Sequence, residues 1–243
     1  MTQYSSSELS EPIGVIAGIQ PVSLLDFPGR VAAVLFLGGC NMRCPYCHNV
    51  SLVAGPWREV MSLEELEEWL AKRAGFLDGV CITGGEPTLA EERLVAICSI
   101  ARNCGLPVKV DTNGTRPAVI DLLLRHELVD YVAVDVKAGP GNYAKAAGVD
   151  VDVKLIASTV GILRARCLSH ELRTTVVPDL HDLREIQAIG EWLGGDSPYF
   201  LQPFRPGPTL DPRFRALPQP DENLLAQLAA AARPYFRCVT VRG

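Results

Sequence analysis

Residues 31–49 read VAAVLFLGGCNMRCPYCHN: an apolar run of strand length, two glycines, and then Cys40, Cys44 and Cys47. Residues 79–87, GVCITGGEP, repeat the order of apolar strand, glycine pair and polar residue, and a segment of helix length follows them. Apolar strands that alternate with amphipathic helices are typical of βα units built around a parallel sheet. These two stretches therefore predict an α/β fold.

The alternation continues along the chain. The expected strands span residues 31–37, 79–83, 108–111, 131–135, 171–176 and 199–202. Capping signals, such as Ser62 before Glu65 and Pro117 in a first turn, predict helices between them. The expected helices span residues 62–75, 90–104, 117–126, 153–166, 182–193 and 221–233. About six βα units fit this chain, which predicts a shorter, open barrel, with a doubly wound parallel sheet as the alternative.

The composition is that of one large globular domain. Of the 243 residues, 48% are hydrophobic and 21% are charged, which is far from the composition of disordered chains. Residues 1–12, MTQYSSSELSEP, are polar and without periodicity. We therefore expect a loose leader over residues 1–12 and a single domain over residues 13–243.

Charge and hydropathy restrict the partners and the compartment. The 23 basic and 28 acidic residues give a net charge of -5, so the chain lacks the basic field that nucleic-acid binding needs. No apolar run approaches the ~18 residues of a membrane span. No basic residue precedes Arg30, which argues against a secretory signal. We therefore expect a cytoplasmic protein with no nucleic-acid partner and no membrane segment.

Eight cysteines in a reducing compartment do not indicate a disulfide framework. The close set Cys40-x3-Cys44-x2-Cys47 instead indicates one metal site. Zinc would lack a fourth ligand, because His48 is too close to Cys47 to join the same tetrahedron. Haem attachment at C-x-x-C-H leaves Cys40 unused, and a thioredoxin-like dithiol uses only two thiols. A cubane iron–sulfur cluster uses all three thiolates and leaves one iron open. The scattered cysteines are expected to be small buried apolar side chains: Cys81, Cys98, Cys104, Cys167 and Cys238.

Polar residues follow the ends of the expected strands. These residues are Gly84, Gly85, Glu86, Asp111, Asn113, Asp135 and Lys137. Because the carboxyl ends of parallel strands meet at one edge of the sheet, we expect them to converge on one ligand together with the cysteine loop. His126 and His181 are expected to have no catalytic role, and the proline-rich segment over residues 203–220 is expected to be a long irregular loop that borders a lateral opening.

The cysteine loop, with Tyr46 before its last cysteine, resembles the cluster loop of the radical S-adenosylmethionine (SAM) superfamily, and residues 84–87 resemble its GGE motif. A longer ordered set is similar to the anaerobic ribonucleoside-triphosphate reductase activating proteins, over about residues 13–243. The set comprises residues 24–29 (LLDFPG), 44–49 (CPYCHN), 83–88 (TGGEPT), 111–114 (DTNG), 173–178 (RTTVVP) and 202–206 (QPFRP).

This resemblance implies a partial (β/α)6 TIM-like barrel with one [4Fe–4S] cluster held by Cys40, Cys44 and Cys47. It also implies that the open iron binds SAM. The residues that the resemblance assigns to cofactor binding are Tyr46, His48, Asn49, Gly84, Gly85, Glu86, Asp111, Asn113, Asp135, Lys137 and Arg173. Glu86 is suited to accept from the SAM ammonium, and Lys137 is suited to face a carboxylate. Arg205 stands where distant relatives, the pyruvate formate-lyase activating enzymes, carry a histidine.

The resemblance further implies an activating enzyme. Reductive cleavage of SAM would give methionine and a 5'-deoxyadenosyl radical, which takes a hydrogen from a glycine Cα of anaerobic ribonucleotide reductase. A flavodoxin or a ferredoxin would supply the electron. Two alternatives remain open: a radical SAM enzyme that acts on a small molecule, resembling 7-carboxy-7-deazaguanine synthase, and a non-catalytic zinc or iron–sulfur binding module.

Overall fold

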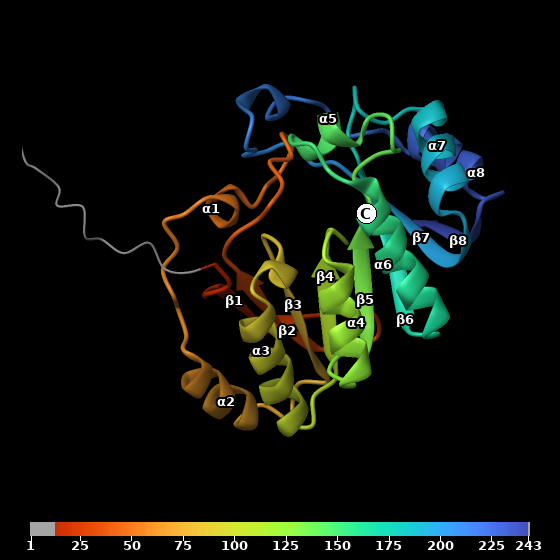
Figure 1. Cartoon of the computed structure of the whole chain (residues 1–243). Helices are drawn as coiled ribbons and strands as arrows, with labels where there is room; N and C mark the ends of the chain where they lie inside the picture. The colour runs from red at the N-terminus through yellow and green to blue at the C-terminus, as the bar shows by residue number, and fades with distance from the viewer. Residues whose placement is uncertain (1–12, 243) are drawn as a thin grey trace, which may run out of the picture.

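The computed structural model describes residues 13–242, so the expected leader lies outside the described residues. One eight-stranded sheet forms the centre of the molecule, with the strands in sequential order (Figure 1). Its strands are β1 (Ile16–Ser23), β2 (Ala32–Leu37), β3 (Gly79–Gly84), β4 (Val108–Thr112), β5 (Tyr131–Asp135), β6 (Ser169–Val176), β7 (Gly195–Pro203) and β8 (Phe236–Val241). Strand β1 runs antiparallel to β2, and every later pair is parallel.

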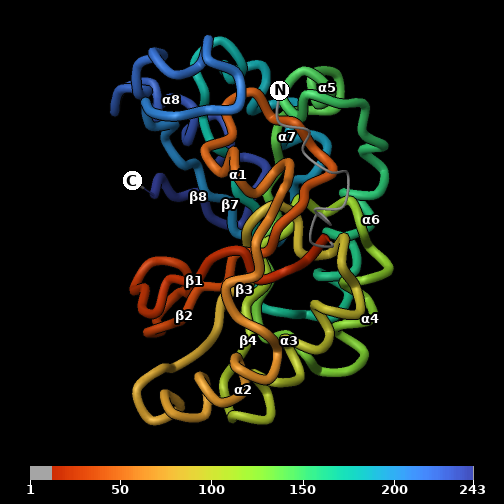
Figure 2. Tube along the Cα trace, turned by 90° about the vertical axis from the view of Figure 1, so that its left-hand side faces the viewer, coloured from red at the N-terminus to blue at the C-terminus, as the bar shows by residue number. Residues whose placement is uncertain are grey.

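Helices cover the outer face of this sheet. They are α1 (Val50–Val53), α2 (Leu63–Ala71), α3 (Glu91–Asn103), α4 (Pro117–Arg125), α5 (Tyr143–Ala147), α6 (Val153–Ala165), α7 (Leu183–Leu193) and α8 (Glu222–Ala232), with 3-10 turns at Pro87–Leu89 and Pro212–Phe214. Figure 2 shows α4 and α6 on the side of the sheet away from the β1–β2 hairpin. None of the helices among residues 13–242 is long and apolar enough to cross a membrane.

The sheet is an open barrel. The pairing runs from β1 to β8 without reversal, which excludes the doubly wound alternative. Within the described residues β1 and β8 do not pair with each other, so both remain edge strands. Strands β2 to β7, each followed by helix, supply the six expected βα units. The predicted partial (β/α)6 barrel is confirmed, with β1 and β8 added at its two ends.

Two glycines fix how the loops meet at the carboxyl end of the barrel. Gly84 has φ +128°, and a Cβ there would collide with the backbone of Leu37. At Gly85, a Cβ would collide with the carbonyl of Gly39, the same carbonyl that accepts the Glu86 N–H at 2.7 Å. The glycine pair therefore lets the end of β3 lie directly against the start of the cysteine loop.

The two faces of the central strands differ in polarity. In β4, Val108 and Val110 join the apolar core, whereas Lys109, which alternates with them, is only 1% exposed. In β6, Glu171 is 0% exposed and is followed by Leu172, which is part of the same core. The outer face of the sheet is therefore apolar under the helices, while the barrel interior contains charged side chains.

Candidate functional site

The cysteine loop connects β2 to α1 and forms one wall of a pocket at the carboxyl end of the barrel. Backbone hydrogen bonds hold this loop on both sides: Gly39 N–H donates to Leu52 O at 2.7 Å, and Arg43 N–H donates to Ala147 O at 2.8 Å. The pocket is lined by Cys40, Met42, Cys44, Cys47, Asn49, Val53, Thr83, Gly84, Gly85, Glu86, Asp111, Thr112, Asn113, Asp135 and Lys137. The predicted convergence of the cysteine loop with the strand ends is therefore confirmed.

The three thiols face this pocket from different points along the loop. Burial raises the pKa of Cys44 to about 11, and it also raises the pKa of Cys40, whose Sγ accepts the Met42 N–H at 3.4 Å. The positive charge of Lys137 acts in the opposite direction and lowers the pKa of both thiols. Among residues 13–242 no three His, Cys, Asp or Glu side chains lie close enough to hold a single metal ion. Soft thiol ligands arranged around a wider pocket suit an iron–sulfur cluster, which spreads its ligands over several irons.

Tyr46 belongs to the cysteine loop but is not among the residues that line the pocket. It is buried, and its ring lies 6.4 Å from that of Phe214. Its hydroxyl has no hydrogen-bond partner within the part of the chain that the structure describes. A buried hydroxyl without a partner is uncommon, so this atom is available to a group bound beside Cys44.

Glu86 connects the end of β3 to the end of β4. Its Oε1 accepts from Thr88 Oγ1 at 2.5 Å, from Thr88 N at 3.1 Å and from Thr112 Oγ1 at 2.7 Å, and its Oε2 accepts from Asn113 N at 2.6 Å. Burial raises its pKa, against the effect of these donors. A carboxylate has about four acceptor positions, so Oε2 keeps capacity for one more donor. The expected contact with an ammonium stays a prediction, and any such contact uses Oε2.

A second connection joins the cysteine loop to β4. Asn113 Nδ2 donates to Asn41 Oδ1 at 2.8 Å, and Asn41 Nδ2 donates to Thr115 Oγ1 at 2.9 Å. Asn49 Nδ2 in turn donates to Gly84 O at 3.3 Å. Sequence reasoning missed Asn41; its only signal was a polar amide between Cys40 and the next cysteine.

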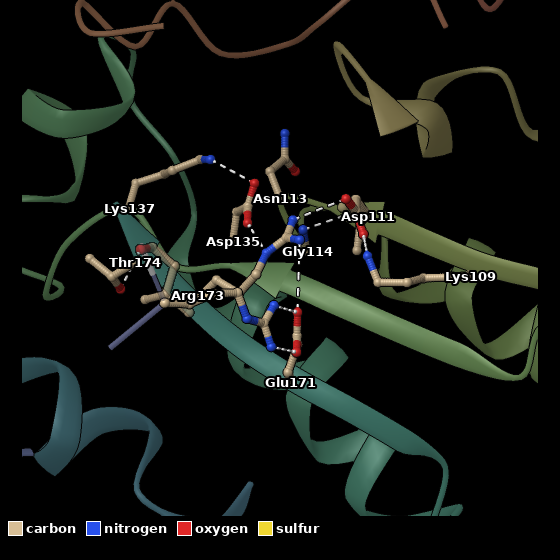
Figure 3. A network of polar contacts seen from close by, with 12 residues as sticks. Lys109, Asp111, Asn113, Gly114, Asp135, Lys137, Glu171, Arg173 and Thr174 are labelled. Carbon is tan, nitrogen blue, oxygen red and sulfur yellow. Dashed lines mark hydrogen bonds and ion pairs between the residues drawn. The ribbon is translucent and has the colours of Figure 1, made fainter. Parts of the chain in front are cut away.

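Ion pairs cross the barrel interior below the pocket (Figure 3). The guanidinium of Arg173 lies between two carboxylates: its Nε is 2.8 Å from Asp135 Oδ1 and its Nη2 is 3.2 Å from Asp111 Oδ2. Lys137 Nζ lies 3.2 Å from Asp135 Oδ2, and Lys109 pairs with Asp111. Burial would raise the pKa of Asp135, but Arg173 and Lys137 outweigh it and hold that pKa well below its usual range.

The network continues to Arg242, the residue directly after the last strand, β8. Arg242 Nη1 and Nη2 lie 2.9 and 2.8 Å from the two Glu171 oxygens, and the guanidinium lies 3.8 Å from the ring centroid of Phe200. Tyr131 also donates to Glu171, at 2.9 Å. Sequence reasoning missed Lys109, Glu171 and Arg242. A charged residue inside an apolar strand was the available signal, because such a residue must face either solvent or an ion partner.

Three predicted site residues, Tyr46, His48 and Arg173, are not among the residues that line the pocket. His48 is exposed, stacks on Phe204 with ring centroids 5.3 Å apart, and lies 2.9 Å through Nδ1 from Pro208 O. Arg173 lies behind Asp111 and Asp135, as described above. The proline-rich segment is irregular after Pro203 apart from the 3-10 turn at Pro212–Phe214, as expected, and it contacts the cysteine loop, where Leu210 N–H donates to Cys47 O at 3.0 Å.

The expectation for the scattered cysteines was wrong in part. Cys81 and Cys98 are buried, as expected. Cys104 is half-buried, and both Cys167 and Cys238 are exposed. Cys167 occupies a left-handed turn with φ +52° after α6, and Cys238 lies on the edge strand β8.

Comparisons with known proteins identify the class. The family model of the radical SAM superfamily matches residues 34–193. The chain therefore belongs to the radical SAM superfamily. It is an enzyme, and its cofactors are a [4Fe–4S] cluster and S-adenosylmethionine. This excludes the zinc, haem, dithiol and non-catalytic alternatives.

Similar proteins indicate which group of radical SAM enzymes the chain resembles. The chain is similar to a putative glycyl-radical enzyme activating enzyme of Methanocaldococcus jannaschii, with 36% identity over 233 residues that span 94% of this chain and 95% of the relative. Similarity to a pyruvate formate-lyase-activating enzyme of Clostridium pasteurianum reaches 32% and covers 51% of this chain and 53% of the relative. A 7-carboxy-7-deazaguanine synthase of Hyperthermus butylicus is 39% identical over 44% of this chain and 43% of the relative. The full-length relative places the chain with the glycyl-radical activating enzymes.

Solved structures agree on the fold. Streptococcus suis SuiB bound to S-adenosylmethionine aligns with a TM-score of 0.63 and 12% identity, over 84% of this chain and 48% of that one. QueE of Escherichia coli aligns with a TM-score of 0.53 and 17% identity, over 95% of this chain and 94% of that one. At these identities the likeness concerns the fold alone.

Proposed function

We propose that this enzyme reductively cleaves S-adenosylmethionine and generates a glycyl radical on an anaerobic ribonucleoside-triphosphate reductase. The observation that carries the proposal is the full-length similarity to a putative glycyl-radical enzyme activating enzyme. The ordered motifs from residues 24–29 to residues 202–206 support a reductase as the substrate protein. A flavodoxin or a ferredoxin is the proposed electron donor, and the cytoplasm the proposed compartment.

In this proposal Cys40, Cys44 and Cys47 hold the cluster, because all three line one pocket and a cluster with three thiolate ligands keeps an iron open. The bound cluster supplies the electron for cleavage of S-adenosylmethionine. The Asn49 side chain donates to the Gly84 carbonyl, and this hydrogen bond holds the three cysteines close to the glycine pair. His48 supports the loop from outside through Phe204.

The remaining side chains hold the amino-acid and ribose ends of S-adenosylmethionine. Gly84 and Gly85 allow the backbone to approach the ligand closely, and the open position on Glu86 Oε2 suits an ammonium. Lys137 lines the pocket and suits the carboxylate. Three remaining polar residues of the pocket lining, Asp111, Asn113 and Asp135, suit the ribose hydroxyls. Tyr46 is proposed for the adenine side because its buried hydroxyl has no partner among the described residues. Arg173 lies behind Asp111 and Asp135 and holds their carboxylates in place through ion pairs.

A second candidate is a small-molecule enzyme like 7-carboxy-7-deazaguanine synthase, since one relative of that name is 39% identical over part of the chain. The ion pairs of the barrel interior favour the first candidate. Asp111, Asp135 and Glu171 each already pair with cations of this chain. A small charged substrate would have to displace these pairs, at a desolvation cost, whereas a polypeptide loop can reach the pocket from outside.

The deciding experiment is electron paramagnetic resonance on the substrate protein. The reconstituted enzyme is reduced without oxygen and mixed with S-adenosylmethionine and a candidate reductase, and a glycyl-radical doublet on the reductase is expected. The matched control is Cys44→Ala, which must give no doublet. If several reductases of the same organism give none, while a deazapurine precursor is converted, the second candidate replaces the first.

A further inference from the structure

His181 lies outside the pocket, buried between the ends of β5 and β6, with 5% of its surface exposed. Its Nδ1 accepts the backbone N–H of Val177 at 3.0 Å, and its Nε2 lies 2.9 Å from Lys137 O. A backbone N–H can only donate, so Nδ1 is the unprotonated nitrogen. Nε2 therefore carries the proton and donates to the Lys137 carbonyl, which fixes one tautomer.

Glu185, four residues further along and in the first turn of α7, holds the same segment at two more points. Its carboxylate accepts from the Gly139 N–H, and its Oε2 accepts from Asn142 Nδ2 at 2.6 Å. A Cβ at Gly139 would lie 2.9 Å from the Ala188 Cβ, so glycine lets this segment rest directly on α7. Residues 137–142 are thus fixed at their first, third and last positions.

The segment carries groups of the site at both ends. At its start, Lys137 lines the pocket and pairs with Asp135 at 3.2 Å. Beyond its end, α5 supports the cysteine loop through the Arg43 N–H to Ala147 O hydrogen bond of 2.8 Å. His181 itself is not among the residues that line the pocket. Any effect it has on a bound ligand therefore passes through residues 137–142.

We propose that His181 and Glu185 are positioning residues that place the Lys137 ammonium and the cysteine loop for ligand binding. This inference rests on the proposed role of Lys137 toward S-adenosylmethionine. In this proposal His181 and Glu185 contact neither the cluster nor the ligand and act only through residues 137–142. Because His181 holds the Lys137 carbonyl and Glu185 holds the Gly139 N–H, losing either contact frees backbone next to the Lys137 side chain.

The contact also depends on proton binding. Burial lowers the pKa of His181, whereas the Lys137 carbonyl and the carboxylates of Glu185 and Asp182 oppose this shift. Three further charged side chains line the same cavity as His181: Lys145, Asp179 and Arg184. A protonated imidazole would turn an N–H toward the Val177 N–H, so acid releases the contact. Since the folded pKa lies below the ordinary value near 6.5, the stabilisation is complete above that pH and is lost as pH falls through the folded pKa.

The test uses the full chain in two forms. In the cluster-free protein, hydrogen exchange of residues 137–142 is compared among wild type, His181→Leu and His181→Gln. In the reconstituted protein, the dissociation constant of S-adenosylmethionine is measured as a function of pH. His126→Gln is the matched control, because His126 caps α4 and is exposed.

We expect His181→Leu to speed exchange at residues 137–142 and to weaken S-adenosylmethionine binding about tenfold, since a buried carbonyl loses its donor. Glutamine can still donate to Lys137 O and does not titrate, so His181→Gln should bind nearly as wild type at neutral pH and lose the part of the acid limb that comes from His181. Unchanged affinity in His181→Leu, or an acid limb in His181→Gln that is identical to that of wild type, overturns the proposal. If His181→Leu does not fold, the glutamine pH profile decides alone. A wild type that binds S-adenosylmethionine with this pH profile but forms no glycyl radical refutes the proposed function and leaves this inference standing.

Discussion

Replacing Arg173 by leucine should destabilise the fold strongly, because its guanidinium holds two carboxylates inside the barrel. The side chain is 12% exposed, and it lies 3.2 Å from an Asp111 oxygen and 2.8 Å from an Asp135 oxygen. Removing one partner of a buried ion pair typically costs 3–5 kcal/mol. Here each carboxylate keeps a second cation, Lys109 or Lys137, so we expect the lower end, about 3 kcal/mol.

The assay is urea unfolding of the cluster-free protein at neutral pH. Arg166→Met is the matched control, because Arg166 is 44% exposed and pairs with the surface residue Asp121; such pairs contribute roughly 0–1 kcal/mol. Arg173→Lys should fall between the two, since a lysine cannot contact both carboxylates in the same fork. If Arg173→Leu stays within about 1 kcal/mol of wild type, the ion pairs of the barrel interior do not stabilise the fold and the reasoning is refuted.

The remaining predictions concern the cofactors and the buried side chains. Anaerobic reconstitution should give about four irons per chain, as expected for one cubane cluster; iron and sulfide analysis checks this, and about eight irons would refute it. Cys44→Ala should abolish production of 5'-deoxyadenosine, whereas Cys98→Ala should retain it and lose only about 1 kcal/mol of packing energy, and the exposed Cys167→Ala should change neither measurement. Tyr46→Phe should leave the thermal stability of the cluster-free protein unchanged or slightly higher, because its hydroxyl has no hydrogen-bond partner among the described residues; a melting temperature several degrees lower would contradict this.

Hydrophobic periodicity predicted the six inner strands, β2 to β7, and missed the two edge strands, β1 and β8. Strands β2 to β7 are apolar enough to stand out, and their ends agree with expectation within a few residues. Strand β1 contains Pro21 and buries only two of its eight residues, and β8 exposes four of its six residues. Edge strands of an open barrel bury one face poorly, so the period-2 signal is weak there.

The sequence predicted which residues meet at the site, because their convergence follows from the direction of the strands. Because β2 to β5 are parallel, the cysteine loop, the glycine pair, Asp111 and Asp135 had to meet at one edge. The partners within that edge were not predictable. The hydrogen bonds of Glu86 to Thr88, Thr112 and Asn113 depend on how two loops fold back, and a linear motif does not contain that geometry.

The unpredicted strand β8 also bears on the site. Glu171 is 0% exposed and depends on Arg242 for two of its contacts, while Arg173 Nη1 lies 3.8 Å from its Oε1. Without Arg242, the buried Glu171 carboxylate would compete with Asp111 and Asp135 for the Arg173 guanidinium. The last strand therefore determines how firmly Arg173 holds the two carboxylates below the pocket. Arg242, next to the edge strand β8, thus influences the pocket on β2 to β5 through its ion pair with Glu171, which leaves Arg173 free to pair with Asp111 and Asp135.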